Sequence, residues 1–268
     1  MPTFERDGAT IAYTDTGAPD RPEAPVLVFG HGLLFSGWMF HPQIAALRAR
    51  YRCVTLDWRG QGASPPAPGG YDLDSLTADA VALIRQLGVG PVHWVGLSMG
   101  GFVGLRLAAR HPELVRSLVL LDTSAAGEEP EKTRRNNLLA RVQQLVGIKA
   151  VLGRVKPLLF GPAFLADPAA RATLAEWTAQ LTRVGRGGLR QAVLGVSRRA
   201  PVIAELAAIT APTLVVVGAD DVATPPAESE YLAAHITGAE LHVVPECGHT
   251  SSLEQPAVIT ALLEKFLG

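Results

Sequence analysis

Short apolar runs alternate with stretches of helical periodicity along most of this chain, and turn-forming residues such as glycine and aspartate follow the runs. Runs of this kind predict strands that are buried on both faces. The predicted strands are Pro25–Phe29, Arg52–Leu56, Val92–Val95, Leu118–Leu121, Pro212–Val217 and Glu240–Val244. The predicted helices are Pro42–Arg50, a segment from Asp72 to Leu87, a segment from Phe102 to about His111, Ala227–His235 and Pro256–Phe266.

The order of these elements predicts an α/β protein. Strands that alternate with helices form a mostly parallel sheet with helices on both faces. The start of the chain differs, because Asp7-Gly8 separates two short strand patterns, Thr3–Glu5 and Thr10–Thr14. An Asp-Gly pair in that position predicts an antiparallel hairpin at a sheet edge, and a polar turn over residues 17–25 follows it.

The pattern changes between residues 125 and 208, where helical periodicity continues without a buried strand pattern. We therefore expect two parts: a core formed by residues 1–124 and 209–268, and a helical cap formed by residues 125–208. The helices expected in the cap are Leu138–Val146, Val151–Phe160, Ala169–Leu181 and Leu189–Arg198, with breaks at Gly161-Pro162 and Gly185–Gly188. The Arg134-Arg135 and Arg198-Arg199 pairs are interpreted as solvated surface.

Composition argues against several classes of protein: nucleic-acid binders, membrane proteins, disulfide-rich proteins and metalloproteins. The 268 residues carry a formal net charge of −1, which does not favour binding to nucleic acid or to an anionic membrane. The two cysteines are far apart, so a disulfide framework is excluded and no metal-binding spacing is present. The first ten residues have no apolar targeting segment, and no apolar run is long enough to span a membrane. We expect a cytoplasmic protein without a metal or other cofactor.

The chemistry centres on Gly96-Leu97-Ser98-Met99-Gly100, which lies between a predicted strand and a predicted helix. This arrangement is typical of a nucleophile elbow, a sharp turn that holds a serine hydroxyl at the end of a sheet. Glycines are needed on both sides of Ser98 because side chains there would collide across the turn. The motif also occurs by chance, so the rest of a catalytic site must be found elsewhere in the chain.

A serine hydroxyl needs a general base, and the base needs an acid that fixes its tautomer. His249 follows the last predicted strand in a Gly-His loop and is the best base of the seven histidines. The acid is expected after the strand Pro212–Val217, where Asp220 and Asp221 compete, and Asp122 after an earlier strand is a weaker alternative. The order of serine, acid and histidine along the chain is the one expected for this elbow.

Acyl transfer also requires an oxyanion hole, usually two backbone N–H groups. Met99, directly after the serine, and Leu33, directly after His31-Gly32, are the candidate donors. We expect the apolar side chains of Leu34, Phe35 and Trp38 to line the substrate pocket, together with Trp177 from the cap.

With these motifs in place, the chain resembles the α/β-hydrolase superfamily over nearly its full length. The resemblance rests on Gly30-His31-Gly32, the Asp57–Ser64 loop, the Ser98 elbow, Gly218-x-x-Asp221-x-x-Thr224-Pro225 and Gly248-His249. It implies a mostly parallel eight-stranded sheet with a cap inserted after the sixth strand, a structural role for the Asp57 loop, and Asp221 as the acid. Lidded esterases and enol-lactonases of the 3-oxoadipate enol-lactonase type look nearest.

The expected function is a serine hydrolase that cleaves carboxylic esters or lactones through an acyl-enzyme, with a small or medium apolar acyl group. Ser98 argues against the haloalkane dehalogenases and epoxide hydrolases of this fold, which use aspartate at the elbow. Carbon–carbon bond hydrolases and haloperoxidase-like esterases share the serine triad and stay open, as does a non-catalytic small-molecule receptor. The partner is a small molecule, and a monomer and a homodimer are equally open.

Overall fold

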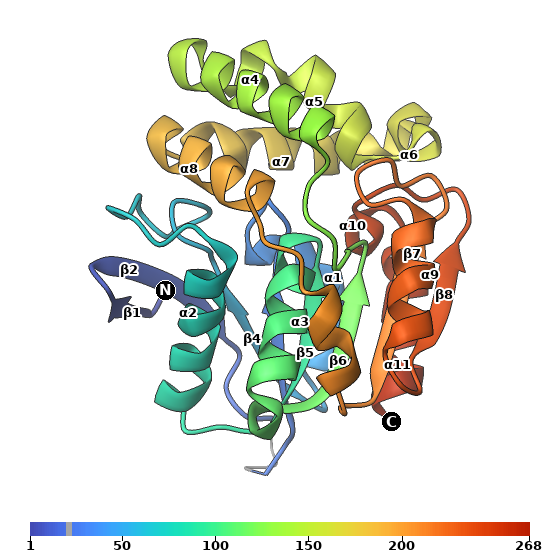
Figure 1. Ribbon diagram of the computed structural model, residues 1–268. Helices are drawn as coiled ribbons and strands as arrows, with labels where there is room; N and C mark the ends of the chain where they lie inside the picture. Colours follow the sequence, from blue (N-terminus) through green and yellow to red (C-terminus); the bar gives the residue numbers. More distant parts are fainter. Residues whose placement is uncertain (20–22) are drawn as a thin grey trace.

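The structure of residues 1–19 and 23–268 is a computed structural model, and residues 20–22 of the expected polar turn lie outside the described residues. Within these ranges, eight strands form one sheet in the order β1-β2-β4-β3-β5-β6-β7-β8 (Figure 1). The strands are β1 Thr3–Arg6, β2 Ala9–Asp15, β3 Val26–Gly30, β4 Arg52–Leu56, β5 Val92–Leu97, β6 Val115–Leu121, β7 Thr213–Gly218 and β8 Glu240–Val244.

The strand directions confirm the predicted α/β fold. β1 and β2 form the expected hairpin, and β2 also runs antiparallel to β4. All pairings from β4 through β3, β5, β6 and β7 to β8 are parallel. The carboxyl ends of these parallel strands therefore meet at one edge of the sheet, where the loops that follow them come together.

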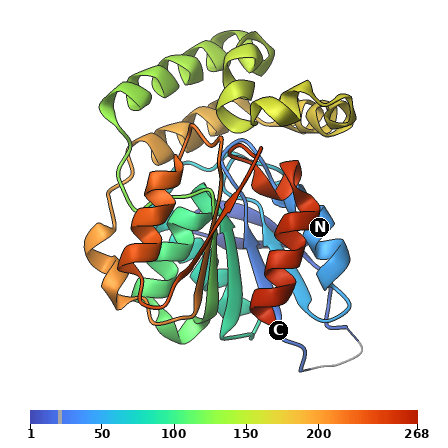
Figure 2. The same ribbon diagram turned by 90° about the vertical axis from the view of Figure 1, so that its right-hand side faces the viewer.

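Helices cover both faces of the sheet (Figure 2). Alternate residues of β3 explain why, since Val28 packs with one buried cluster and Phe29 with the other. The first cluster includes α2 Leu73–Gln86, α3 Met99–Arg110 and α9 Pro226–His235, and the second includes α1 His41–Leu47 and α11 Pro256–Leu267. Two short helices, η1 Gly37–Phe40 and α10 Ser251–Glu254, lie beside α1, and η2 Pro112–Leu114 leads into β6.

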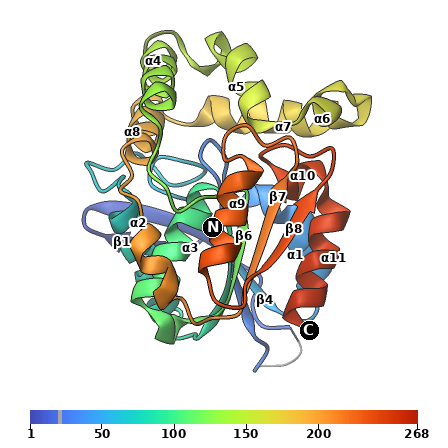
Figure 3. The same cartoon turned by 45° about the vertical axis from the view of Figure 1, so that its right-hand side comes forward.

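The segment between β6 and β7 is helical, and all of it except its last helix crosses above the carboxyl edge of the sheet (Figures 1 and 3). Its helices are α4 Pro130–Val146, η3 Ile148–Ala150, α5 Leu152–Leu159, α6 Pro162–Ala166, η4 Pro168–Ala170, α7 Arg171–Arg183, α8 Arg186–Ser197 and η5 Ile203–Ala208. The last helix, η5, lies beside α3 and α9. The N–H of Val202 donates to the carbonyl of Ala125 at 2.9 Å, so the chain leaves and returns at adjacent points. That residues 125–208 are a separate domain stays a prediction.

Several predicted boundaries were wrong for local reasons. β6 begins three residues earlier than predicted, because the exposed Arg116 interrupts its apolar run. α4 begins at Pro130 instead of Leu138, within a charged stretch that hid the helix. The predicted break at Gly185–Gly188 is confirmed only at its start, because Gly188 belongs to α8. A Cβ on Gly188 would lie 3.0 Å from the Cα of Gly60, so glycine allows the close approach of α8 to the loop after β4.

Candidate active site

Ser98 occupies the sharp turn between β5 and α3, with φ 51° and ψ −110°, a conformation that residues other than glycine rarely adopt. Glycines make this turn possible. A Cβ on Gly96 would collide with the carbonyl oxygen of Gly100, and a Cβ on Gly100 would collide with that of Gly30 on the neighbouring strand. The backbone N–H of Ser98 donates to the Leu121 carbonyl at 2.9 Å, which ties the turn to β6.

Three side chains from separate strand ends meet at this turn. The Nε2 atom of His249 lies 2.9 Å from the Oγ atom of Ser98, and its Nδ1 atom lies 2.8 Å from the Oδ2 atom of Asp221. His249 comes from the loop after β8, and Asp221 comes from the loop after β7. The geometry also separates the two competing aspartates, because Asp220 is exposed while Asp221 is buried against the histidine.

The carboxylate of Asp221 is fixed by its own loop. Its Oδ1 atom accepts the backbone N–H groups of Ala223, at 2.8 Å, and Thr224, at 3.0 Å, and its Oδ2 atom accepts the Thr224 hydroxyl at 2.8 Å. Burial would raise the pKa of Asp221, but the charge of His249 and these hydrogen bonds outweigh burial and lower it. An ionised, immobile carboxylate therefore faces the imidazole.

The hydrogen-bonded pair of Asp221 and His249 also sets the basicity of the histidine. Burial alone would lower the pKa of His249, but the negative charge of Asp221 and the hydrogen bond to it raise the pKa above its ordinary value of 6.5. A hydrogen bond from Nδ1–H to Asp221 leaves Nε2 free to accept the Ser98 proton. This arrangement can ionise a serine hydroxyl as it attacks.

Asp122, the weaker candidate acid, lies next to this site but binds backbone. Its Oδ1 atom accepts the Gly218 N–H at 3.0 Å, and its Oδ2 atom accepts the Ser251 N–H at 3.1 Å. Burial and the nearby charge of Asp221 raise the pKa of Asp122 to about 8. Asp122 thus ties together the loops that carry Asp221 and His249, and the described structure has no hydrogen bond between it and His249.

The loop after β3 lies against the elbow. A Cβ on Gly32 would lie 3.6 Å from the Cβ of Ser98, so the backbone that carries the Leu33 amide passes directly beside the serine. Among the described residues, neither the Leu33 N–H nor the Met99 N–H has a hydrogen-bond acceptor. Met99 is the first residue of α3, where backbone N–H groups are free and the helix dipole is positive. Both amides are thus available to a negatively charged oxygen.

Leu34 of this loop has an unusual backbone conformation, with φ 71°, and hydrogen bonds on both sides hold it. Its N–H donates to the Gln61 side chain at 2.8 Å, and its carbonyl accepts the indole N–H of Trp177 at 3.0 Å. The indole of Trp177 also stacks on Phe35, with ring centroids 5.9 Å apart. Helix α7 therefore fastens the loop next to the Leu33 amide.

The remaining sequence motifs support these loops. His31 is buried, and its Nε2 atom accepts the Trp58 N–H at 3.1 Å while its Nδ1–H donates to the adjacent carbonyl at 2.7 Å. Burial lowers the pKa of His31, so it is neutral. The two carboxylate oxygens of Asp57 accept the N–H groups of Gly37 and Ala63, each at 2.8 Å. Neither side chain faces Ser98.

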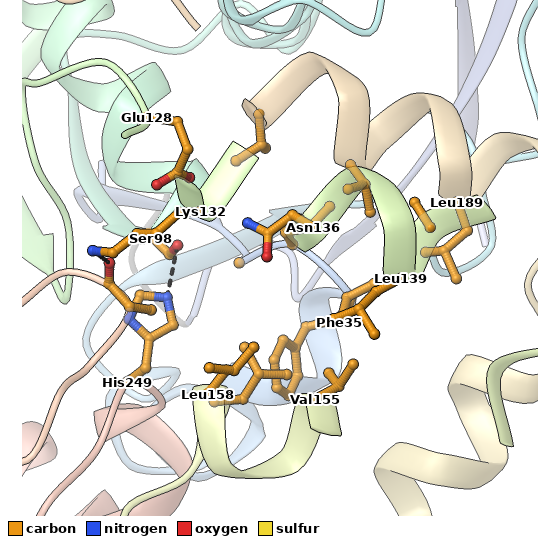
Figure 4. A pocket seen from close by; sticks show the side chains of 18 of the residues that line it. Phe35, Ser98, Glu128, Lys132, Asn136, Leu139, Val155, Leu158, Leu189 and His249 are labelled. Atoms are coloured by element: carbon orange, nitrogen blue, oxygen red, sulfur yellow. Dashed lines mark hydrogen bonds between the residues drawn. The ribbon is translucent and has the colours of Figure 1, made fainter. Parts of the chain in front are cut away.

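A cavity of about 130 Å³ opens onto Ser98 and His249, between the sheet and the helical segment (Figure 4). Of the four residues expected to line the substrate pocket, Leu34 and Phe35 line this cavity and Trp38 and Trp177 do not. That the cavity holds the substrate stays a prediction. Trp177 lies behind Phe35, where its indole serves the hydrogen bond to Leu34. Most of the lining residues are apolar. Those from the helical segment lie on α4, η3, α5 and α8 and at the junction of η3 with α5: Leu139, Ala140, Ile148, Val151, Val155, Leu158, Leu159, Leu189, Val193 and Val196.

The sequence reasoning missed the polar residues of this cavity. Lys132, Asn136 and Gln143 of α4 all line it, at spacings of four and seven residues that indicate one helix face. The interpretation of Arg198-Arg199 as solvated surface was wrong for Arg199, whose guanidinium is nearly buried against Glu128 at 2.9 Å. The same guanidinium lies 4.3 Å from the ring centroid of Phe102 on α3.

Comparisons with known proteins agree with this geometry. Residues 27–262 match the model of the alpha/beta hydrolase family. The chain belongs to this family. A 3-oxoadipate enol-lactonase of Acinetobacter baylyi is 30% identical over 263 residues, which cover 98% of this chain and 94% of that protein.

Solved structures extend the likeness to the whole fold. The enol-lactonase from Burkholderia xenovorans LB400 superposes with a TM-score of 0.91 at 29% identity and covers 99% of both chains. A thermophilic esterase from Thermogutta terrifontis superposes with a TM-score of 0.88 at 28% identity, over 99% of this chain and 96% of that one. These relatives support a hydrolase of the alpha/beta family, and the resemblance predicted from the sequence is confirmed. None of the described helices combines the length and apolar character that a membrane-spanning helix needs.

Proposed function

We propose that the protein is a serine hydrolase that cleaves carboxylic esters or lactones through an acyl-enzyme. The observation that carries the proposal is the continuous hydrogen-bonded chain from Ser98 Oγ through His249 to Asp221, at 2.9 and 2.8 Å, below a largely apolar cavity. The similarity to enol-lactonases and an esterase adds support for this substrate class.

In the proposed mechanism, Ser98 Oγ attacks the substrate carbonyl while His249 Nε2 takes its proton. The imidazolium that forms is stabilised by Asp221, whose own hydrogen bonds prevent it from turning away. The oxygen of the tetrahedral intermediate accepts the N–H groups of Leu33 and Met99, and each such donor lowers the barrier by about 3 kcal/mol. His249 then protonates the leaving alkoxide, and water attacks the acyl-enzyme by the same route.

The test is the hydrolysis of p-nitrophenyl butyrate by the wild type, Ser98→Ala and Ser229→Ala. Ser229 is a buried serine on α9, away from the cavity lining, and serves as a matched control. We expect Ser98→Ala to lose at least about 1,000-fold in kcat and Ser229→Ala to retain wild-type rates within about twofold. Equal rates in the wild type and Ser98→Ala would refute the proposal.

Mass spectrometry tests the covalent step independently. Phenylmethylsulfonyl fluoride should add one sulfonyl group to the wild type on the peptide that contains Ser98, and none to Ser98→Ala. Turnover of vinylogous diketones in preference to esters would favour the carbon–carbon bond hydrolases instead. Stoichiometric ligand binding with no turnover of any of these compounds would favour a receptor.

A further inference from the structure

The cavity wall formed by α4 mixes polar side chains with the apolar Leu139 and Ala140, and the outer face of this helix is partly apolar. Lys132, Asn136 and Gln143 face the cavity (Figure 4 shows the first two), while Leu138 and Leu145 are 62% and 77% exposed. A surface helix ordinarily turns its apolar side chains inward and its polar side chains toward water. Polar side chains on the inner face of α4 indicate that this part of the cavity is adapted to a ligand with polar groups.

One polar atom of this wall, the Oε1 atom of Gln143, is buried without a hydrogen-bond partner among the described residues. Gln143 as a whole is only 4% exposed. Leaving a buried polar group unpaired is unfavourable, so such groups in a cavity point to a ligand or water that pairs with them.

The charges of the cavity are not balanced. Glu128 is neutralised by Arg199 at 2.9 Å, with both side chains largely buried. Two further cations line the cavity, Lys132 and Arg135, and of these Arg135 is exposed to solvent. Among the described residues, the ammonium of Lys132 has no partner comparable to that of Arg199. Its Nζ atom is 3.6 Å from Glu129, which is 68% exposed, and an exposed pair of this kind contributes little. An ammonium has three donors, and the described structure records one hydrogen bond for it, to the Ala223 carbonyl at 3.3 Å.

This ammonium lies at the catalytic end of the cavity. Ala223 adjoins Thr224, whose hydroxyl bonds to Asp221 and lies 3.3 Å from the Nδ1 atom of His249. Figure 4 shows the side chain of Lys132 extending beside Ser98 and above His249. The side chain of Lys132 is 20% exposed, so water screens its charge only partly.

From this juxtaposition we propose that Lys132 binds a carboxylate of the substrate, so that the preferred substrates are esters or lactones with an acidic group a few bonds from the carbonyl that Ser98 attacks. The inference rests on the proposed function. An ammonium–carboxylate hydrogen bond is stronger than one between neutral groups, and a neutral isostere would leave the ammonium unpaired. The remaining walls are apolar and hold the carbon chain of the substrate.

Two pairs of isosteric esters separate charge from shape. Methyl hydrogen succinate is compared with methyl 4-methylpentanoate, and O-acetylglycolate is compared with isobutyl acetate. The first pair carries the carboxylate on the acyl side and the second on the alcohol side. A pH-stat gives kcat/KM for each ester with the wild type, Lys132→Met, Lys132→Arg and Lys149→Met. Lys149 is exposed and lies outside the cavity lining, so its replacement is the matched control.

We expect the wild type to prefer the anionic ester of at least one pair by about tenfold or more. Lys132→Met should lower that anionic-to-neutral ratio by about 10- to 100-fold, Lys132→Arg should restore most of it, and Lys149→Met should leave it unchanged. If the ratio in Lys132→Met stays within about twofold of the wild type for both pairs, the proposal is wrong, even when Ser98-dependent ester hydrolysis is present.

Binding of glutarate, a dicarboxylate without a scissile bond, tests the inference apart from turnover. Calorimetry should give a Kd about tenfold or more weaker for Lys132→Met than for the wild type, and Lys132→Gln provides a second variant if the first does not fold. Equal affinities in the wild type and the folded variant would overturn the carboxylate site. Loss of ester turnover in the wild type, with glutarate binding still dependent on Lys132, would overturn the proposed function and leave the carboxylate site supported.

Discussion

Trp177→Phe removes one hydrogen bond from the loop beside the catalytic serine. The indole N–H donates to the Leu34 carbonyl at 3.0 Å, and the Leu34 N–H is held on its other side by Gln61 at 2.8 Å. Leu34 has φ 71°, a conformation that leucine leaves readily when it is not held. Phenylalanine keeps the ring that stacks on Phe35 but cannot donate, so Leu34 is then held by Gln61 alone.

The expected size of the effect follows from these contacts. For the free energy of unfolding, the loss of one donor to the half-buried Leu34 carbonyl costs about 1 kcal/mol. The smaller ring of phenylalanine loses roughly a further 1–2 kcal/mol, because it packs less tightly. Complete loss of an oxyanion donor would cost about 3 kcal/mol in the transition state, which sets the upper limit. Because Gln61 still holds Leu34, we expect about 1 kcal/mol, or roughly a fivefold decrease in kcat with little change in KM.

The assay is steady-state hydrolysis of p-nitrophenyl butyrate below the unfolding transition of every variant, together with the Ki of a boronic acid that mimics the tetrahedral intermediate. The Ki should rise by the same factor by which kcat falls. Trp38→Phe is the matched control, because its indole belongs to the same aromatic cluster but has no hydrogen bond among the described residues. If Trp177→Phe and Trp38→Phe have equal kcat and Ki values, Trp177 does not position the oxyanion loop.

Four further outcomes are expected. The wild-type rate should fall as the pH decreases through the pKa of His249, with a midpoint above 6.5 because Asp221 raises that pKa, and a midpoint below 6.5 would contradict this. Asp221→Asn should lower kcat by on the order of 10⁴-fold, whereas Asp220→Asn should change it by less than about twofold. Similar losses in both variants would contradict the assignment of Asp221 alone as the acid. Gly100→Ala should destabilise the fold by about 2 kcal/mol or more in thermal unfolding, because its Cβ meets the Gly30 carbonyl, whereas Gly153→Ala in α5, where a Cβ meets nothing within 4 Å, should be neutral or stabilising. Asp122→Asn should flatten the pH dependence of the free energy of unfolding in urea. The pKa of Asp122 is about 8 in the folded protein and about 4 in the unfolded chain, so the wild type loses up to about 1.4 kcal/mol of stability per pH unit as the pH rises between these values, and asparagine, which does not ionise, removes this loss. Equal slopes in the variant and the wild type would refute the raised pKa, because the backbone hydrogen bond that asparagine also loses does not depend on pH in this range.

The core was predictable because its signals are local. β4 and β8 have the predicted bounds, and each is followed by a residue that favours a turn, Asp57 after β4 and Pro245 after β8. Ser98 and His249 could be placed from the strand ends that they follow. The choice between Asp220 and Asp221 depended on resemblance, because which of two adjacent side chains turns inward is decided by the loop and by its bonds to Thr224.

The lining of the cavity was not predictable, because it depends on contacts between residues that are distant in sequence. Lys132 and Asn136 are polar because they face a cavity, and in sequence they are indistinguishable from residues that face water. Trp38 and Trp177 are apolar and buried, but periodicity cannot tell the surface of a pocket from the layer behind it. Buried arginines such as Arg199 are hidden in the same way, because the partner that neutralises its charge, Glu128, is distant in sequence.

The hydrogen bond between Val202 and Ala125 means that the helical segment enters and leaves the sheet at a single point. Residues 126–201 are thus an insertion whose two ends lie side by side. The positions of β6 and β7 in the sheet do not depend on the number of residues in this insertion. Loop-closure entropy grows only slowly with length, by about 0.6 kcal/mol for each doubling. An insertion with adjacent ends can therefore change in length while β6 and β7 stay in the sheet. Its contacts with the loops of the site, such as the bond from Trp177 to Leu34, couple any such change to the catalytic residues.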